Sequence, residues 1–253
     1  MNATTQKATT QTVTPSSTSS IFWWPVFLLL CCIAAGVALR RIVVLISPPA
    51  APRASQFGAL DAAFASRDLL TLCHVVPALL FILLLPVWFL KSARNRPILH
   101  RRLSYALLFL GAIVGVTALL LSLHPFGGIN EATAAILYDC LFLFSLARAS
   151  LMLIRNDLEL YRRWMIRAVA VLIGIAATRP VMGVFFATES ITHLQPQQFF
   201  GTAFWIGFTS TYIAGEAYLR SHPWSPSAPL RRINGSISAT VLDPQDQSSI
   251  VSV

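Results

Sequence analysis

The chain contains six apolar stretches of roughly 19 to 25 residues, each long enough to cross a membrane as a helix. At a rise of about 1.5 Å per residue, such a helix spans a hydrocarbon core about 30 Å thick. The stretches cover residues 21–46, 69–90, 103–123, 132–154, 164–188 and 199–219. The sequence therefore predicts an all-α fold, an integral membrane bundle of about six transmembrane helices.

The composition leaves room for one membrane domain and no separate soluble domain. Hydrophobic residues make up 55% of the 253 residues and charged residues only 11%, against about 25% charged residues in soluble domains. We expect the transmembrane domain over residues 21–220, with disordered polar tails at 1–20 and 221–253. A proline-rich connector follows the first stretch and leads into an amphipathic segment at 57–67.

Basic residues are concentrated in the two tails and in the loops after the second and fourth stretches. The net charge of +9 therefore reflects membrane topology rather than a nucleic-acid partner, because Lys and Arg accumulate in cytoplasmic loops. We expect a multi-pass protein of a plasma or cell membrane with both termini in the cytoplasm. Arg40 and Arg41 are exceptions near the outer end of the first span, where long side chains reach the interface.

The four cysteines all lie within apolar stretches and form no CxxC pair. This spacing is unlike that of a metal site or a disulfide framework, so we expect the four cysteines to be buried as apolar packing residues. No metal and no cofactor is predicted. The cysteines are Cys31, Cys32, Cys73 and Cys140.

An outer group of ionisable residues is the candidate functional cluster. Counted from the span ends, His74 lies about 7 Å, Asp139 about 10 Å and Arg179 about 13 Å below the outer face. His124, at the start of a loop, lies above them. An ion pair between Asp139 and Arg179 beside a histidine suits proton or ligand handling. A pair that only fixes helix packing is the structural alternative.

An inner group lies near the opposite face. Glu216 and Arg167 each lie about 5 Å, and Arg148 about 9 Å, from the inner face. Because an uncompensated charge in a span is costly, we expect Glu216 to pair with Arg167 or Arg148. His100 lies at a matching depth, and a purely structural role is an open alternative for this group.

Haem b is the cofactor alternative that histidines in a helical bundle raise. A bis-histidine site needs two imidazoles at one depth on facing helices. His74 lies near the outer face and His100 near the inner one, and neither has an evident partner within a span. His124 could pair with His74 only if the end of the third span dips inward. Hydrolytic motifs and a phosphate-binding loop are absent from the sequence.

Several segments resemble one family of predicted membrane proteins, catalogued as domain of unknown function 2306. They are HVVP at 74–77, LHRRL at 99–103, YRRWMIR at 161–167, TRP at 178–180, and then Trp205 and Glu216. The resemblance covers about residues 25–220 and implies a multi-helix membrane protein without a specified activity. Tyr161 stands where the family usually has a histidine, which removes one titratable group from the inner cluster.

Two functional readings follow from these residues. In the first, a non-enzymatic membrane protein handles a small-molecule ligand or protons through the outer cluster. In the second, a membrane-embedded enzyme or haem-binding redox protein uses the same groups. The sequence does not decide whether the protein is an enzyme, and it does not define the oligomeric state. The lipid bilayer is the one partner that the sequence predicts directly.

Overall fold

The computed structural model describes residues 18–47 and 58–222, and every regular element within these ranges is a helix. Most of the two predicted tails lies outside the described residues. The helices are α1 (Thr18–Ile46), α2 (Gly58–Ala65), α3 (Asp68–Phe89), α4 (Lys91–Arg94), α5 (Pro97–Ser122), α6 (Gly128–Ile154), α7 (Leu158–Leu172), α8 (Gly174–Ala187), α9 (Glu189–Thr192) and α10 (Pro196–Ser221).

Five segments of the described chain are long and apolar enough to cross a membrane: α1, α3, α5, α6 and the consecutive pair α7–α8. The sixth predicted span corresponds to α10, which has 26 residues and packs against α6, α7 and α8. The predicted all-α membrane bundle of about six helices is therefore confirmed.

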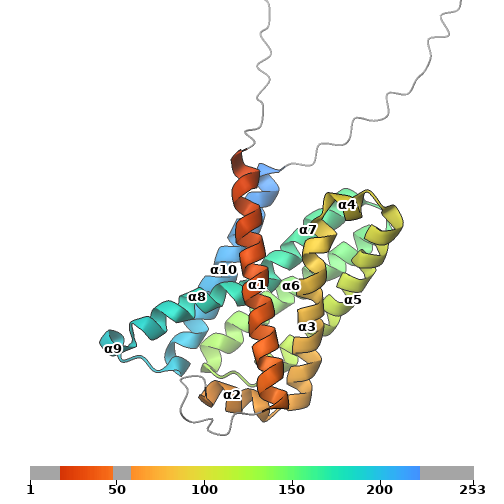
Figure 1. Cartoon of the computed structure of the whole chain (residues 1–253). Coiled ribbons are helices and arrows are strands. Elements are labelled where there is room, and N and C mark those ends of the chain that lie inside the picture. The colour runs from red at the N-terminus through yellow and green to blue at the C-terminus, as the bar shows by residue number, and fades with distance from the viewer. Residues whose placement is uncertain (1–17, 48–57, 223–253) are drawn as a thin grey trace, which may run out of the picture.

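The long helices run up and down through the bundle (Figure 1). The start of α1 and the end of α10 lie at one end, which we call the terminal end, and Trp23 contacts Tyr218 there with ring centroids 6.0 Å apart. The short helix α2 lies at the opposite end, which we call the distal end (Figure 1). Because the start of α1 and the end of α10 lie at the same end of the bundle, the arrangement agrees with an even number of membrane crossings.

Proline and polar side chains set the starts of three helices. Pro97 stands in the first turn of α5 and Pro196 in the first turn of α10. At this position the missing N–H of proline removes no hydrogen bond from the helix. Asp157 precedes α7, and its carboxylate accepts a hydrogen bond from the Leu160 N–H at 3.0 Å. These signals begin the helices three to six residues before the apolar stretches predicted at 103, 164 and 199.

The predicted fifth span, 164–188, is not one continuous helix. It divides at Ile173 into α7 and α8, and the carbonyl of Ile173 accepts the N–H of Ala176 in a tighter turn at 3.0 Å. Gly174 lowers the helix propensity at this point. Pro180 supplies no N–H to the carbonyl four residues before it. Beyond this break α8 extends past α1 toward α9 and packs along α10 (Figure 1).

Two apolar cores fill the bundle. The larger one joins α1, α3, α5, α6 and α7 around Phe81, Leu85, Leu107 and Met165. The smaller one joins α6, α8 and α10 around Met182, Phe199 and Phe204.

Three of the four cysteines are not buried as the sequence predicted. Cys31 is buried, whereas Cys32, Cys73 and Cys140 are exposed on the outer surfaces of their helices.

Candidate functional site

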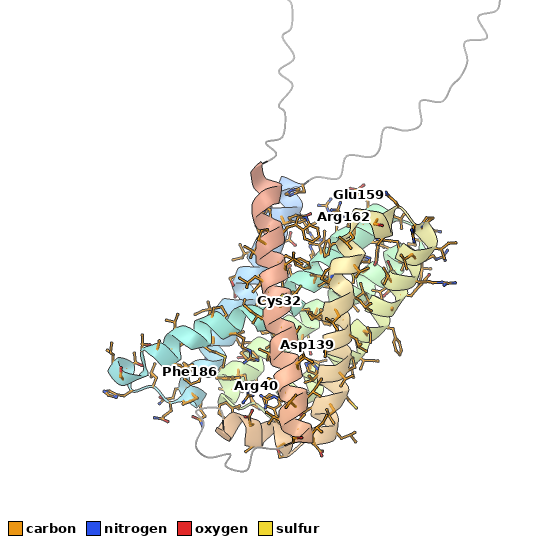
Figure 2. The ribbon with its side chains drawn as sticks, in the orientation of Figure 1. Cys32, Arg40, Asp139, Glu159, Arg162 and Phe186 are labelled. Atoms are coloured by element: carbon orange, nitrogen blue, oxygen red, sulfur yellow. The ribbon has the colours of Figure 1, made fainter. Side chains whose placement is uncertain are left out.

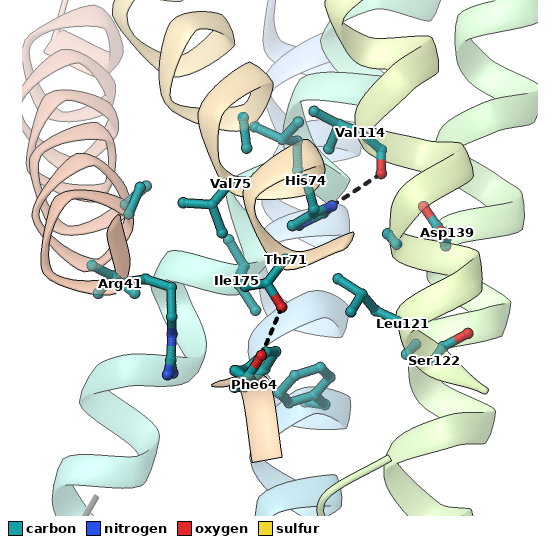
Figure 3. A pocket seen from close by; sticks show the side chains of 18 of the residues that line it. Arg41, Phe64, Thr71, His74, Val75, Val114, Leu121, Ser122, Asp139 and Ile175 are labelled. Atoms are coloured by element: carbon teal, nitrogen blue, oxygen red, sulfur yellow. Dashed lines mark hydrogen bonds between the residues drawn. The ribbon is translucent and has the colours of Figure 1, made fainter. Parts of the chain in front are cut away.

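A cavity of about 270 Å³ lies in the distal half of the bundle. Its walls are mostly apolar and include Ile82, Val171 and a set of aromatic rings: Phe64, Phe126, Phe142, Phe200, Phe204 and Phe208. The four residues of the outer candidate cluster, His74, His124, Asp139 and Arg179, all line this cavity. The fold thus brings together side chains from α3, α6, α8 and the loop after α5. Figure 3 shows His74 and Asp139 among the residues that line the cavity.

His74 is fixed against α5 through one ring nitrogen. Its Nδ1 lies 3.2 Å from the carbonyl oxygen of Val114 and 3.1 Å from the hydroxyl of Thr117 (Figure 3). Because a carbonyl only accepts, Nδ1 carries the proton and donates. The neutral ring therefore keeps Nε2 as a hydrogen-bond acceptor.

Asp139 and Arg179 do not form the ion pair expected from the sequence. The described residues hold three ion pairs within 4.0 Å, and none joins these two side chains. The Oδ2 of Asp139 and the Nε of Arg179 are buried, and neither has a hydrogen-bond partner. Arg179 makes only a weak contact from Nη1 to the Met182 sulfur at 3.6 Å. Similar depth did not predict a pair, because α6 and α8 each pack against α10 and depth does not fix the direction in which a side chain points.

His124 and Glu131 occupy the loop edge of the cavity. His124 is exposed, whereas Glu131 is only 9% exposed and accepts a hydrogen bond from the Gly127 N–H. Sequence reasoning missed Glu131 because it stands in the first turn of α6, before the predicted span at 132. Its proximity to the Gly127-Gly128 turn was the available signal.

A second missed feature lies at the distal end of the bundle, beside the cavity residues Arg41 and Phe64. Asp61 of α2 accepts two hydrogen bonds from Arg40, at 3.0 and 2.7 Å, and one from Arg41 at 2.7 Å. The guanidinium of Arg41 also lies 4.2 Å from the ring centre of Phe64. We call Arg40, Arg41 and Asp61 the arginine clasp. Arg41 is only 8% exposed, so its side chain is held inside the protein by Asp61 and Phe64.

The pKa of Asp61 reflects two opposing effects. Burial raises the pKa of this carboxyl, but the hydrogen bonds and positive charges of Arg40 and Arg41 outweigh burial and bring it below its usual value. Asp61 is therefore ionised at neutral pH, and its charge holds α2 against the end of α1.

The inner group divides into a pair and a separate arginine. The carboxylate of Glu216 pairs with Arg167, with one contact of 3.2 Å from Nη2 to Oε2. Arg167 is the first of the two partners expected for Glu216. Arg148 instead faces Trp164, with its guanidinium carbon 5.4 Å from the ring centre, and its buried Nε has no partner. Arg167 lies over the same ring at 4.7 Å.

His100 lies apart from the Glu216 pair. It stacks on Trp88 with ring centroids 5.6 Å apart, and its carbonyl accepts the hydroxyl of Ser104. The indole N–H of Trp88 in turn donates to Ser104 at 3.2 Å. These contacts fix the packing of α3 on α5 near the terminal end. Figure 2 places Arg40 and Asp139 toward the distal end, and Glu159 and Arg162 at the terminal end.

The cavity offers hydrogen-bonding groups of both kinds within an apolar wall. Arg179 supplies a donor, while Asp139 and His74 supply acceptors. Within the described ranges, no three His, Cys, Asp or Glu side chains gather as a metal ion would require. A concave, largely apolar site with a few convergent polar groups is the usual form of a small-molecule site.

The fold and the cavity together define a multi-pass helical membrane protein with a largely apolar cavity that holds a few polar groups. The model of the family described as predicted membrane protein (DUF2306) matches residues 71–216, more than half of the chain, and the chain belongs to this family. The match is narrower than the expected 25–220 and leaves out α1 and α2, which carry the arginine clasp. No curated protein and no solved structure matches the chain.

Proposed function

We propose that this membrane protein binds a small, largely apolar molecule with a polar head in the distal cavity, without acting on it chemically. One observation carries the proposal: Asp139 and Arg179 face one cavity with buried polar atoms that have no partner. A buried unsatisfied polar atom costs about 1–3 kcal/mol. A ligand that donates to Asp139 and accepts from Arg179 removes both costs at once.

The size and walls of the cavity favour a ligand over protons alone. A proton path needs only a chain of polar groups or waters, whereas most of this wall is aromatic or aliphatic. The apolar body of a ligand fits that wall, and its head meets the polar groups.

The experiment fills the cavity and measures what the purified protein retains. Ala118 of α5 lines the cavity, whereas Ala112 of the same helix faces outward. Small molecules released from wild type, Ala118→Phe and Ala112→Phe are compared by untargeted mass spectrometry. We expect a compound enriched with wild type and Ala112→Phe and lost from Ala118→Phe. Equal profiles for all three proteins would refute the proposal.

A redox protein is the second candidate, because His74 and His124 line the same cavity. His74 uses Nδ1 on the backbone, which leaves Nε2 as the atom that binds haem iron in such sites. A visible absorption spectrum of the purified protein separates the two candidates. A Soret band lost in both His74→Ala and His124→Ala supports the redox candidate, and a flat spectrum supports the ligand proposal.

We also propose that both termini face the cytoplasm in a plasma or cell membrane. The described ends of α1 and α10 lie together, and the loops at that end carry the basic residues. The cavity then opens toward the outer side.

A further inference from the structure

A second groove lies between α1, α7 and α10 at the terminal end of the bundle. Its volume is about 210 Å³, and α1 contributes Trp23, Phe27 and Leu30 to its wall. The facing walls come from Ile166 and Val169 of α7 and from Ala214 of α10. Nearly every wall side chain is aliphatic or aromatic, so the groove suits a hydrocarbon chain rather than a polar ligand.

The length of the groove matches one leaflet of a bilayer. Along α10 it extends from Thr211 to His222, about 16 Å at 1.5 Å per residue. One leaflet contributes half of a hydrocarbon core about 30 Å thick, or about 15 Å. An acyl chain that enters from the terminal end therefore fits the groove over its whole length.

The terminal end of the groove has the residues of a membrane–water interface. Trp23 and Tyr218 meet edge to face, and Tyr218 stacks on His222 with centroids 4.4 Å apart. Such amphipathic rings gather at the head-group level of bilayers. This places the mouth of the groove where the phosphate of a lipid lies.

Positive charge is gathered beside this mouth. Arg163 is exposed on α7, three residues or about one turn before the groove residue Ile166. Arg220 is exposed in the last turn of α10, two residues before the groove residue His222. Glu216 is already paired with Arg167, so a negative head group meets an excess of positive charge here.

We propose that this groove binds one acyl chain of an anionic phospholipid from the leaflet at the terminal end, with the lipid phosphate held by Arg220 and Arg163. The lipid fills the space between α1 and the α7–α10 pair and tethers the first helix to the bundle. This site is separate from the distal cavity and does not depend on the ligand proposed there.

The test offers the purified protein phosphatidylglycerol and phosphatidylcholine in equal amounts and counts retained lipids by native mass spectrometry. Wild type is expected to retain phosphatidylglycerol preferentially. Ala214→Phe fills the groove and should reduce that retention about tenfold, equivalent to about 1.4 kcal/mol. Ala217→Phe, on the exposed side of the same helix, is the matched control and should retain the lipid.

A charge variant tests the head group independently of packing. Arg220→Glu changes an exposed side chain, so the fold is preserved while the preference for phosphatidylglycerol over phosphatidylcholine is lost. Equal retention of the two lipids by wild type would overturn the proposal. So would unchanged retention by Ala214→Phe, or a wild-type dimer that Ala214→Phe converts to a monomer, because a second copy of the chain would then fill the groove.

Discussion

At the scale of a single residue, the hydrogen bonds of His74 determine how His74→Ala affects stability. The Val114 carbonyl that faces Nδ1 also accepts the Thr117 hydroxyl at 3.0 Å, so His74→Ala leaves no unsatisfied acceptor. We expect a loss of stability of about 1 kcal/mol or less, together with loss of the compound retained by the cavity. Melting temperature and ligand release measure the two effects. Cys73→Ala, a neighbouring exposed position, is the control, and parallel losses in both variants would contradict a role for His74.

Replacing Glu216 should lower stability more than replacing His74, because Arg167 then remains without its ion-pair partner. Glu216→Gln removes the charge that balances the partly buried Arg167, and we expect the protein to lose about 1–3 kcal/mol of stability. Asp157→Asn is the control, since an asparagine oxygen still accepts the Leu160 N–H at the start of α7. Thermal unfolding in detergent measures both variants, and equal melting temperatures would contradict a stabilising pair.

At the scale of elements, the arginine clasp joins α2 to α1. Asp61→Asn removes the carboxylate that balances the buried Arg41, and we expect a loss of about 1–3 kcal/mol. Arg40, with 45% of its side chain exposed, contributes the smaller part because water screens it. Asp68→Asn, at an exposed carboxylate that accepts from Leu69, should leave the melting temperature unchanged. An equal effect of both substitutions would show that the clasp is not stabilising.

The clasp also predicts a pH dependence with a defined sign. The pKa of Asp61 lies below its usual value in the folded protein, and an unfolded aspartate titrates near about 3.9. The stabilising contribution is therefore complete above about pH 4 and is lost as the pH falls through the folded pKa. Asp61→Asn should flatten this acid limb of the melting-temperature profile, and an unchanged limb would assign it to other groups.

Gly207 of α10 allows a close approach to α8. A Cβ added at Gly207 would lie 2.8 Å from the backbone nitrogen of Thr178 and 3.0 Å from its Cα, so Gly207→Ala must push the helices apart. We expect a loss of roughly 1–3 kcal/mol and a displacement of the neighbouring Arg179 that weakens ligand retention. Gly183→Ala on α8 meets nothing within 4 Å and should be neutral or stabilising by up to about 1 kcal/mol. Similar melting temperatures for the two variants would contradict this packing.

At the scale of the whole molecule, the proposed topology places both chain ends on the cytoplasmic side. An even number of crossings and the basic residues of the terminal end support this orientation. Epitope tags at the two ends should be inaccessible to antibody added outside intact cells and become accessible after the membrane is permeabilised. One accessible tag would imply an odd number of crossings, and two accessible tags would reverse the orientation.

The sequence predicts the spans well because apolar length is a local property. Depth counting also anticipated that His74, Asp139 and Arg179 lie at similar levels, and all three line one cavity. The contacts between side chains on different helices could not be predicted from depth alone. Asp139 and Arg179 lie on α6 and α8, which both pack against α10, and their side chains do not pair. The short helix α2 folds back and brings Asp61 to Arg41, 20 residues away. Both depend on tertiary packing rather than on any local pattern.

In the proposed function, Asp139 and Arg179 are kept unpaired for a ligand. An experimental density map of the protein purified from its own membrane would show what occupies the cavity between them. We expect non-protein density in the distal cavity within hydrogen-bonding distance of Asp139 Oδ2 and Arg179 Nε, two buried atoms without partners that face this cavity. A direct ion pair between these two side chains across an empty cavity would contradict it.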